Sequence, residues 1–374
     1  MPKLVTADLS NNAEPCVLRY TTIDHKMLDI HGGFDADIVS HTYDNNKGEV
    51  VFNKHITEIE SATFYNCFTL TSITIPKSIT LIGREAFSYC DNLKDVYISD
   101  LSAWCKISFY GSNANPLCNR ANLHIKGEIV SRLTIPSDIT HIGEHTFYNC
   151  KSLISVVIPN SVTSIGYAAF RGCSSLIDIT IPDSIIKIGK HSFDECINLT
   201  NITIPNSIIS IGEYAFFGCR NLTSVYISDL SIWCKIDFGR CNNLCHNAEL
   251  YLNNNIIAHL YIPLGVTEIK DSAFCGCSSL TSITIPNSTT SIGMDAFWGC
   301  SNLVNVTISN GITEIMSRAF YECSNLKTII CKATIPPKLG KYAFENIPKD
   351  ATIIIPEGCE EAYMNSDWRY LFEK

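Results

Sequence analysis

One short pattern recurs along this chain of 374 residues and restricts its fold more than any other feature. The text SVTSIGYAAFRGC (residues 161–173) returns as SIIKIGKHSFDEC (residues 184–196) and again as SIISIGEYAFFGC (residues 207–219). A repeat of this short length cannot bury its own apolar face, so neighbouring repeats must stack and share one core. With 46% apolar and 17% charged residues, the chain can build such a core. The pattern therefore predicts a solenoid.

A phenylalanine occupies the same place in every repeat and defines the register. The series is Phe64, Phe87, Phe147, Phe170, Phe193, Phe216, Phe274, Phe297, Phe320 and Phe344. Its members are almost evenly spaced, apart from two long steps, one from Phe87 to Phe147 and one from Phe216 to Phe274. A period in the twenties is typical of leucine-rich repeats, in which each repeat contributes one strand and a return segment.

Each repeat begins with a strand pattern. In LTSITIP (residues 70–76), Ser72 and Thr74 alternate with isoleucines, which indicates a half-buried strand, and Pro76 ends it because proline has no N–H group to donate. In the SITLIG that follows, Gly83 permits a tight bend. We expect an α/β-type but mostly β solenoid: a leucine-rich-repeat array with a parallel β-sheet on one face and short helical or irregular return segments.

The two long steps contain matching text. They read DVYISDLSAWCKISF (residues 95–109) and SVYISDLSIWCKIDF (residues 224–238), which occupy the same place after Phe87 and after Phe216. Asp100 and Asp229 are typical helix N-caps, and the tryptophans that follow them lie on an apolar helical face. We expect a short helix to replace the return segment in each of these long repeats.

The ends of the chain do not repeat, and repeat arrays need capped ends. We predict an N-terminal cap at residues 1–49, a repeat array at 50–347 with long repeats near 95–135 and 224–262, and a C-terminal cap at 348–374. The last segment, GCEEAYMNSDWRYLFEK, has helical spacing. With both ends capped, we expect a monomer, and a structural or self-assembling repeat protein is the alternative.

The repeat text IPNSVTSIGYAAFRGCSSLIDIT, the inserted ISDLSAWCKI, and the flanks LRYTTIDHKMLDI and IIIPEGCEEAY resemble the BspA-like leucine-rich-repeat proteins of bacteria and protists. The resemblance implies a solenoid that binds other macromolecules, often as a secreted or surface adhesin toward host matrix proteins or other cells. The first residues lack the apolar core of a signal peptide, which favours the cytoplasm and an intracellular scaffold. Both compartments stay open at this point.

Several function classes are disfavoured. The net charge of −9 argues against binding to a nucleic-acid backbone, which needs clustered Lys and Arg. No apolar run approaches the roughly 18–20 residues of a membrane-spanning helix, so we expect no membrane insertion. The sequence has no GxGxxG, Walker, HExxH or GxSxG motif, so we expect neither an enzyme nor a cofactor.

Cysteine is abundant, with 18 copies, and half of these share one repeat position. That position comprises Cys67, Cys90, Cys150, Cys173, Cys196, Cys219, Cys277, Cys300 and Cys323. A free cysteine behaves as a small apolar side chain, so we expect a buried ladder of reduced thiols; partial oxidation is the alternative. Cys241, Cys245 and His246 are zinc-ligand types, but the first long repeat has no cysteine in place of Cys241, so we expect no metal site. His141 and His145 have helical ligand spacing, but the next repeat keeps neither histidine, so we expect structural roles.

The outward positions of the strands are mostly Ser, Thr and Asn, which suit a strand whether or not a partner binds. Larger or charged side chains interrupt this pattern, chiefly near the long repeats, and Tyr and Arg are favoured interface anchors. The candidate binding residues are Tyr97, Tyr226, Tyr261, Arg132, His259, Asp95 and Asp178. We expect a protein partner, with host matrix or cell-surface proteins as the class that the resemblance implies. A second aromatic stripe follows the repeat phenylalanines, as either packing between repeats or an exposed patch: Tyr65, Tyr148, Phe217, Trp298 and Tyr321.

Overall fold

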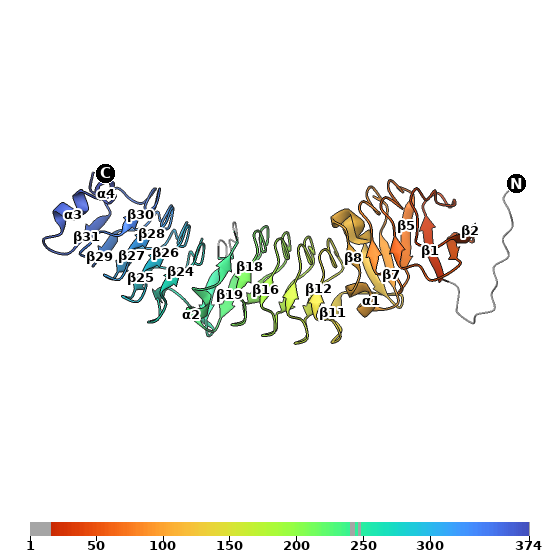
Figure 1. Cartoon of the computed structure of the whole chain (residues 1–374), viewed down its shortest axis with the longest axis horizontal. Coiled ribbons are helices and arrows are strands. Elements are labelled where there is room, and N and C mark those ends of the chain that lie inside the picture. Colours follow the sequence, from red (N-terminus) through yellow and green to blue (C-terminus); the bar gives the residue numbers. More distant parts are fainter. Residues whose placement is uncertain (1–15, 240–243, 246–247, 374) are drawn as a thin grey trace. The chain divides into compact units, whose positions relative to one another are not determined.

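The computed structural model describes residues 16–239, 244–245 and 248–373, and it divides into a first body, Met1–Leu176, and a second body, Ile177–Lys374. In each body short strands stack side by side, with few helices (Figure 1). Each body is a mostly-β solenoid with parallel sheets, which confirms the predicted fold class.

The main sheet of the first body has the strand order β10-β9-β7-β5-β1-β3-β2. Its repeat strands β5, β7 and β9 are parallel and in register, with Ser72 opposite Asp95 and Asp95 opposite Asn122. Strand β1 pairs antiparallel with β5 and with β3, so three antiparallel strands in the order β1-β3-β2 cover the first edge of the repeat strands. The bounds are β1 Cys16–Thr22, β2 Ile38–Asp44, β3 Lys47–Phe52, β5 Leu70–Ile75, β7 Asp95–Ile98, β9 Asn122–Ile125 and β10 Glu128–Ile129.

The first body also contains two-residue strands that form a second parallel ladder, which the sequence patterns did not predict. This ladder is interrupted at the long repeat, because β8 ends one sheet and β12 begins another. The remaining elements are β4 Glu58–Ile59, β6 Leu81–Ile82, α1 Leu101–Cys105, β8 Ser108–Phe109, η1 Ser112–Ala114, η2 Pro116–Asn119, β11 Arg132–Thr134, β12 His141–Ile142, β13 Ser155–Val157 and β14 Ser164–Ile165.

The second body repeats this scheme, with parallel repeat strands and a parallel ladder of two-residue strands. Its first elements are β15 Asp178–Thr180, β16 Lys187–Ile188, β17 Asn201–Thr203, β18 Ser210–Ile211, β19 Ser224–Ile227, α2 Leu230–Trp233, β20 Asp237–Phe238, β21 Glu249–Leu252, β22 Asn255–Ile256 and β23 His259–Tyr261. The chain continues through β24 Glu268–Ile269, β25 Ser282–Ile285, β26 Ser291–Ile292, β27 Asn305–Ile308, β28 Glu314–Ile315, β29 Thr328–Cys331, β30 Lys338–Leu339, β31 Thr352–Ile354, α3 Glu360–Met364 and α4 Arg369–Phe372.

The return segments of ordinary repeats form a third hydrogen-bonded column. Residues two before and two after the repeat phenylalanine take left-handed backbone angles, as Ala62 and Asn66 do with φ of 58° each. This alternation points N–H groups along the stack, so Ala62 N and Phe64 N each donate to the following repeat at 2.9 Å. Backbone groups of the return side are thereby paired without a helix, as buried groups must be.

Phenylalanines and cysteines fill the core beneath these columns. Phe297 stacks on Phe274 and Phe320 with ring centroids 5.2 and 5.1 Å apart. The Cys300 thiol donates to the Phe274 carbonyl of the preceding repeat at 3.2 Å, and other ladder cysteines do the same. The described cysteines are free thiols, all buried except Cys359, which is half-buried.

The recurrent glycine after the two-residue strand is explained by close packing rather than by a left-handed bend. A Cβ atom on Gly83 would lie 2.5 Å from the backbone nitrogen of Ser61 in the preceding repeat, and one on Gly212 would lie 2.4 Å from Lys190 N. After the first long repeat, Gly143 would place its Cβ no closer than 3.2 Å to any atom. Close packing therefore favours glycine behind some ordinary repeats, although Met316 takes the equivalent place behind another ordinary repeat, where its backbone nitrogen donates to Ile292 O at 2.9 Å.

The first repeat of the first body and the last repeat of the second body are each covered by polar or aromatic contacts. The Asp35 carboxylate accepts hydrogen bonds from Thr57 N at 2.9 Å and Glu58 N at 3.1 Å, at the first two-residue strand. At the other end, the buried Tyr363 and Trp368 donate to backbone carbonyls. The domain boundaries at residues 49 and 347 stay predictions. Within the described ranges, no helix has the length and apolarity that crossing a bilayer requires.

Candidate functional site

The helices of the long repeats form where the sequence predicted them. The Asp100 carboxylate caps α1 by accepting from Ala103 N at 3.0 Å, and Asp229 caps α2 by accepting from Ser231 N at 2.7 Å. The Trp104 indole is buried and donates to Thr146 O at 3.1 Å. Trp233 makes the equivalent bond to Ala273 O at 2.9 Å. Each helix is thus fastened to the ordinary repeat that follows it.

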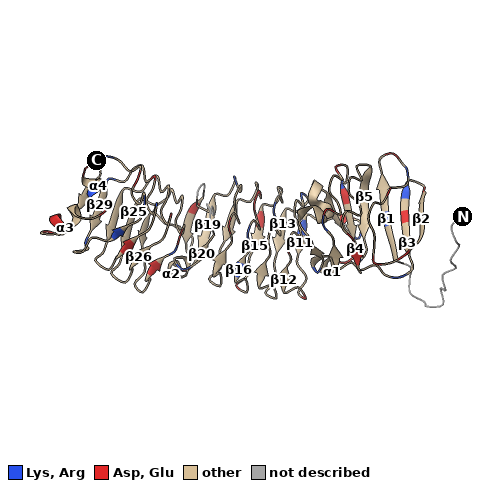
Figure 2. Ribbon diagram, turned by 45° about the horizontal axis from the view of Figure 1, so that its top comes forward, with Lys and Arg blue, Asp and Glu red and all other residues tan. Residues whose placement is uncertain are grey.

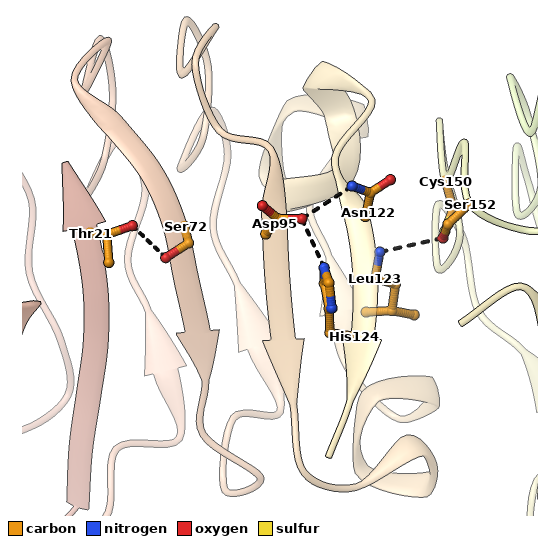
Figure 3. Close-up of polar contacts among 8 residues, drawn as sticks. All are labelled: Thr21, Ser72, Asp95, Asn122, Leu123, His124, Cys150 and Ser152. Carbon is orange, nitrogen blue, oxygen red and sulfur yellow. Dashed lines mark hydrogen bonds and ion pairs between the residues drawn. The ribbon is translucent and has the colours of Figure 1, made fainter. Parts of the chain in front are cut away.

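In the first long repeat, two rings stack on the outer sheet face, by which we mean the face formed by outward-pointing side chains of the repeat strands. Tyr97 on β7 lies opposite His124 on β9, with ring centroids 4.5 Å apart and planes at 27°. Asp95 precedes Tyr97 by two residues and points to the same face. Its Oδ1 lies 2.8 Å from His124 Nε2 and accepts from Asn122 Nδ2 at 3.1 Å (Figure 3). We call Asp95, Tyr97, Asn122 and His124 the Asp95 cluster.

The electrostatics of the Asp95 cluster follow from its partial burial. Burial raises the pKa of Tyr97, and the negative charge of Asp95 raises it further. The His124 side chain is almost fully buried, and its Nδ1 has no hydrogen-bond partner among the described residues. Asp95 remains partly exposed, with 32% of its side-chain surface accessible.

The second long repeat carries a comparable arrangement. Tyr226 on β19 stacks on Tyr251 of β21, with centroids 4.9 Å apart and planes at 28°. The Tyr251 hydroxyl donates to Glu249 Oε2 at 2.7 Å, and this hydrogen bond raises the pKa of Tyr251. We call Ser224, Tyr226, Glu249 and Tyr251 the Glu249 cluster.

The structure groups only some of the predicted residues. Asp95 and Tyr97 lie together, and Tyr226 belongs to the Glu249 cluster. The others stand elsewhere on the outer face: Arg132 and Asp178 are exposed on β11 and β15, Tyr261 is 69% exposed on β23, and His259 lies 2.8 Å from Ser282 Oγ. Their binding roles stay predictions.

Sequence reasoning missed Asn122, His124, Glu249 and Tyr251. A signal was present, because NLHI and ELYL alternate polar and aromatic residues with apolar ones. Their pairing with Tyr97 and Tyr226 could not be read locally, since a helix and its connections separate the partner strands in sequence.

The second aromatic stripe lies on the return side. Tyr65 packs against Tyr89 edge to face at 5.4 Å, and Trp298 against Tyr321 at 6.3 Å. The Trp298 indole also donates to Glu322 Oε2 at 3.0 Å. These contacts join neighbouring repeats, although Tyr65 and Phe217 keep exposed surface.

The predicted absence of a metal site stays a prediction. In the described part of the chain, no three His, Cys, Asp or Glu side chains are grouped so that they could hold a metal ion. Cys241 and His246 lie outside the described residues, and Cys245 is buried. His141 contacts Ser164 Oγ at 2.6 Å, whereas burial and the charge of Arg171 lower the pKa of His145 to about 4.

Charged residues are sparse on the strands. Figure 2 shows most strand positions without charge, with isolated acidic and basic residues between them.

Comparison with known proteins identifies related sequences and structures. A family model described as BspA type leucine rich repeat region matches residues 38–124, 124–245 and 247–366. Among solved structures, a leucine-rich repeat protein from Bacteroides ovatus is 22% identical, with 84% of this chain and 90% of that chain covered and a TM-score of 0.47. A leucine rich cell surface protein from Faecalibacterium prausnitzii is 23% identical, with 94% and 98% covered and a TM-score of 0.46. No curated protein matches the chain.

Proposed function

The chain belongs to the BspA-type leucine-rich repeat family, and from this premise we propose that it is a non-catalytic binding solenoid whose outer sheet face recognises a protein partner. The observation that carries the proposal is the stacked aromatic pair on that face in each long repeat. Stacked repeats present broad, regular surfaces that suit macromolecular partners.

The aromatic pairs stack across neighbouring strands, and rings are not needed there to continue the sheet. The residues opposite Tyr97 and Tyr226 in the preceding repeats are Thr74 and Thr203, which complete the same strands with small side chains. The rings of Tyr97, Tyr226 and Tyr251 are half-buried on this face, so each keeps part of its surface accessible. Aromatic side chains of this kind anchor protein interfaces because they bury much surface with little loss of conformational freedom.

The class of partner follows from the family. Host matrix and cell-surface proteins are the macromolecules that the family resemblance implies, and we propose them as the first candidates. We also infer a monomer, because Asp35 covers the first two-residue strand of the first body and Trp368 packs behind the last repeat of the second body. Light scattering on the purified chain checks this, and a defined dimer or a filament would contradict it.

The proposal is tested by titrating labelled chain onto a panel of immobilised matrix and cell-surface proteins. Tyr97→Ala with Tyr226→Ala should weaken binding about tenfold or more, as expected for interface anchors. The matched control is Thr180→Ala with Thr203→Ala, which changes two exposed strand positions without removing a ring. Equal losses for the two double variants would refute the role of the aromatic pairs.

A further inference from the structure

We propose that the Asp95 cluster and the Glu249 cluster each bind a cationic side chain, arginine or lysine, of the partner protein. This inference rests on the proposed function, since it concerns the same outer sheet face. It adds the chemistry of what is recognised there.

The Asp95 carboxylate is held in place through one oxygen, Oδ1, and Oδ2 accepts no hydrogen bond from the described residues. Both of its hydrogen bonds, from Asn122 Nδ2 and with His124 Nε2, go to Oδ1. Within the described part of the chain, no hydrogen bond reaches Oδ2, and Figure 3 shows this oxygen turned away from both partners. An oxygen fixed in this way is ready to accept a hydrogen bond from a charged donor without reordering the side chain.

The charge of Asp95 is not neutralised by a lysine or arginine. Its one ion-pair partner in the described ranges is the His124 ring. Since a carboxylate accepts and does not donate, His124 Nε2 is the donor in this contact.

Glu249 also has one carboxylate oxygen without a hydrogen bond from the described residues of the second long repeat. Its Oε2 accepts the Tyr251 hydroxyl, and among the described contacts Oε1 has no hydrogen-bond partner. Lys327 lines the polar groove beside Glu249, but no ion pair within the described residues joins the two. This carboxylate is exposed and adjoins a stacked pair of rings.

The carboxylate of each cluster stands on a different strand of its long repeat. Asp95 is on β7 and faces neutral Asn122, whereas in the second long repeat the β19 position is neutral Ser224 and the acid is Glu249 on β21. What both clusters share is one carboxylate beside two stacked rings, not an identical set of residues. This recurrence in non-equivalent positions indicates a common ligand chemistry.

A cation fits this combination better than other ligands. A carboxylate attracts guanidinium or ammonium groups, and aromatic rings add cation–π attraction. An anionic partner would be repelled by the carboxylate of each cluster. The net charge of −9 also favours encounter with a basic partner.

The test uses a fluorescent peptide of alternating arginine and glycine, titrated with the full chain at physiological salt. Peptides with citrulline or glutamate in place of arginine supply the neutral and acidic probes. We expect the arginine peptide to bind about tenfold more tightly than either, and Asp95→Asn with Glu249→Gln to remove about tenfold of its affinity. The control, Asp183→Asn with Glu357→Gln, changes the net charge equally at two other exposed sites and should change affinity less than about twofold.

Two results would overturn the inference: equal affinity for arginine and citrulline peptides, or equal losses in the site and control variants. Panel binding by the tyrosine double variant and the carboxylate double variant distinguishes failure of this inference from failure of the proposed function. If Tyr97→Ala with Tyr226→Ala abolishes panel binding while Asp95→Asn with Glu249→Gln does not, the face binds its partner without cation recognition. If neither double variant reduces panel binding, both proposals are wrong.

Discussion

Ordinary repeats and long repeats differ in how closely they pack against the repeat that follows them. Where one ordinary repeat follows another, contact is so close that a Cβ on Gly293 would lie 2.5 Å from Asp271 N. At the long repeats the ladder of two-residue strands stops, with β8 and β20 ending sheets and β12 and β24 beginning new ones. The stacked rings of the outer face occur at these same repeats. The long repeats therefore combine an interrupted ladder of two-residue strands with the aromatic pairs of the Asp95 and Glu249 clusters.

The two long repeats also differ from each other. Lys270 stands after the second where Gly143 stands after the first; its backbone nitrogen donates to Cys234 O at 3.0 Å, and its ammonium pairs with Glu268 at 2.6 Å. Beside Gly143 there is instead a groove, which Lys106 and Asp138 line as an ion pair. The same sequence position is therefore filled in one body and open in the other.

The largest effect should come from removing the indole that fastens a long repeat to its neighbour. Trp233→Ala empties a buried site and leaves Ala273 O without its donor, so we expect a loss of about 3–5 kcal/mol in the free energy of unfolding. Urea denaturation followed by circular dichroism measures it. A loss below about 1 kcal/mol, at the level of a surface substitution, would show that α2 is not anchored by this contact.

A pair of glycine substitutions tests the stacking difference directly. Gly212→Ala forces a Cβ to within 2.4 Å of Lys190 N, so we expect it to destabilise the chain by about 1–3 kcal/mol. Gly143→Ala meets nothing closer than 3.2 Å and should change stability by less than about 0.5 kcal/mol. Thermal unfolding of both variants compares them, and similar losses would mean that long repeats pack as tightly as ordinary ones.

A smaller effect is expected at the helix caps. Asp229→Ala removes the acceptor for Ser231 N and should cost about 1 kcal/mol. The hydrogen bond from the Ser231 hydroxyl, followed by the backbone N–H bonds, lowers the pKa of Asp229 despite partial burial. A depressed pKa means that the contribution is complete above the ordinary Asp pKa of about 4 and is lost as pH falls through the folded-state value. The difference between wild type and variant should thus shrink below about pH 4, and an unchanged difference at about pH 2 would contradict the role of the ionised cap.

The smallest effect concerns the reactivity of thiols rather than stability. Thiol labelling of the native chain should distinguish the buried cysteine ladder from Cys359 near the C-terminus. Burial raises the pKa of ladder thiols such as Cys219 and Cys323, each to about 12, and thiol reagents attack the thiolate. Half-buried Cys359 should react with a disulfide reagent in the native state, whereas the ladder should react only after unfolding. Cys359→Ser should therefore remove one fast-reacting thiol, and rapid labelling of Cys300 in a peptide map would contradict the buried ladder.

Local patterns were enough to predict much of this fold. The repeat period, the alternation in β5 and the caps Asp100 and Asp229 each depend on residues close in sequence. The second ladder was missed because a two-residue strand such as Leu81–Ile82 has too little length to show a period. The return column was missed because left-handed residues such as Tyr214 carry no sequence signal of that conformation.

The candidate site was harder to predict than the fold. Tyr97 and Tyr226 were visible as exceptions in a row of threonines, but their partners His124 and Tyr251 come from strands that follow the helices. The two long repeats also differ slightly in length, so an alignment of the two repeats without a gap does not match Asn122 with Glu249, which occupy equivalent strand positions. Only the strand register shows which side chains stand together.

The central claim is that the outer sheet face binds the partner, and hydroxyl-radical footprinting tests it most directly because tyrosines on both faces report separately. The sheet-face reporters are Tyr97, Tyr226, Tyr251 and Tyr261, and the return-side reporters are Tyr65, Tyr89 and Tyr342. With the protein selected from the binding panel, we predict that oxidation of the sheet-face tyrosines falls while that of the return-side tyrosines is unchanged. Protection of the return side with an unprotected sheet face would contradict the account.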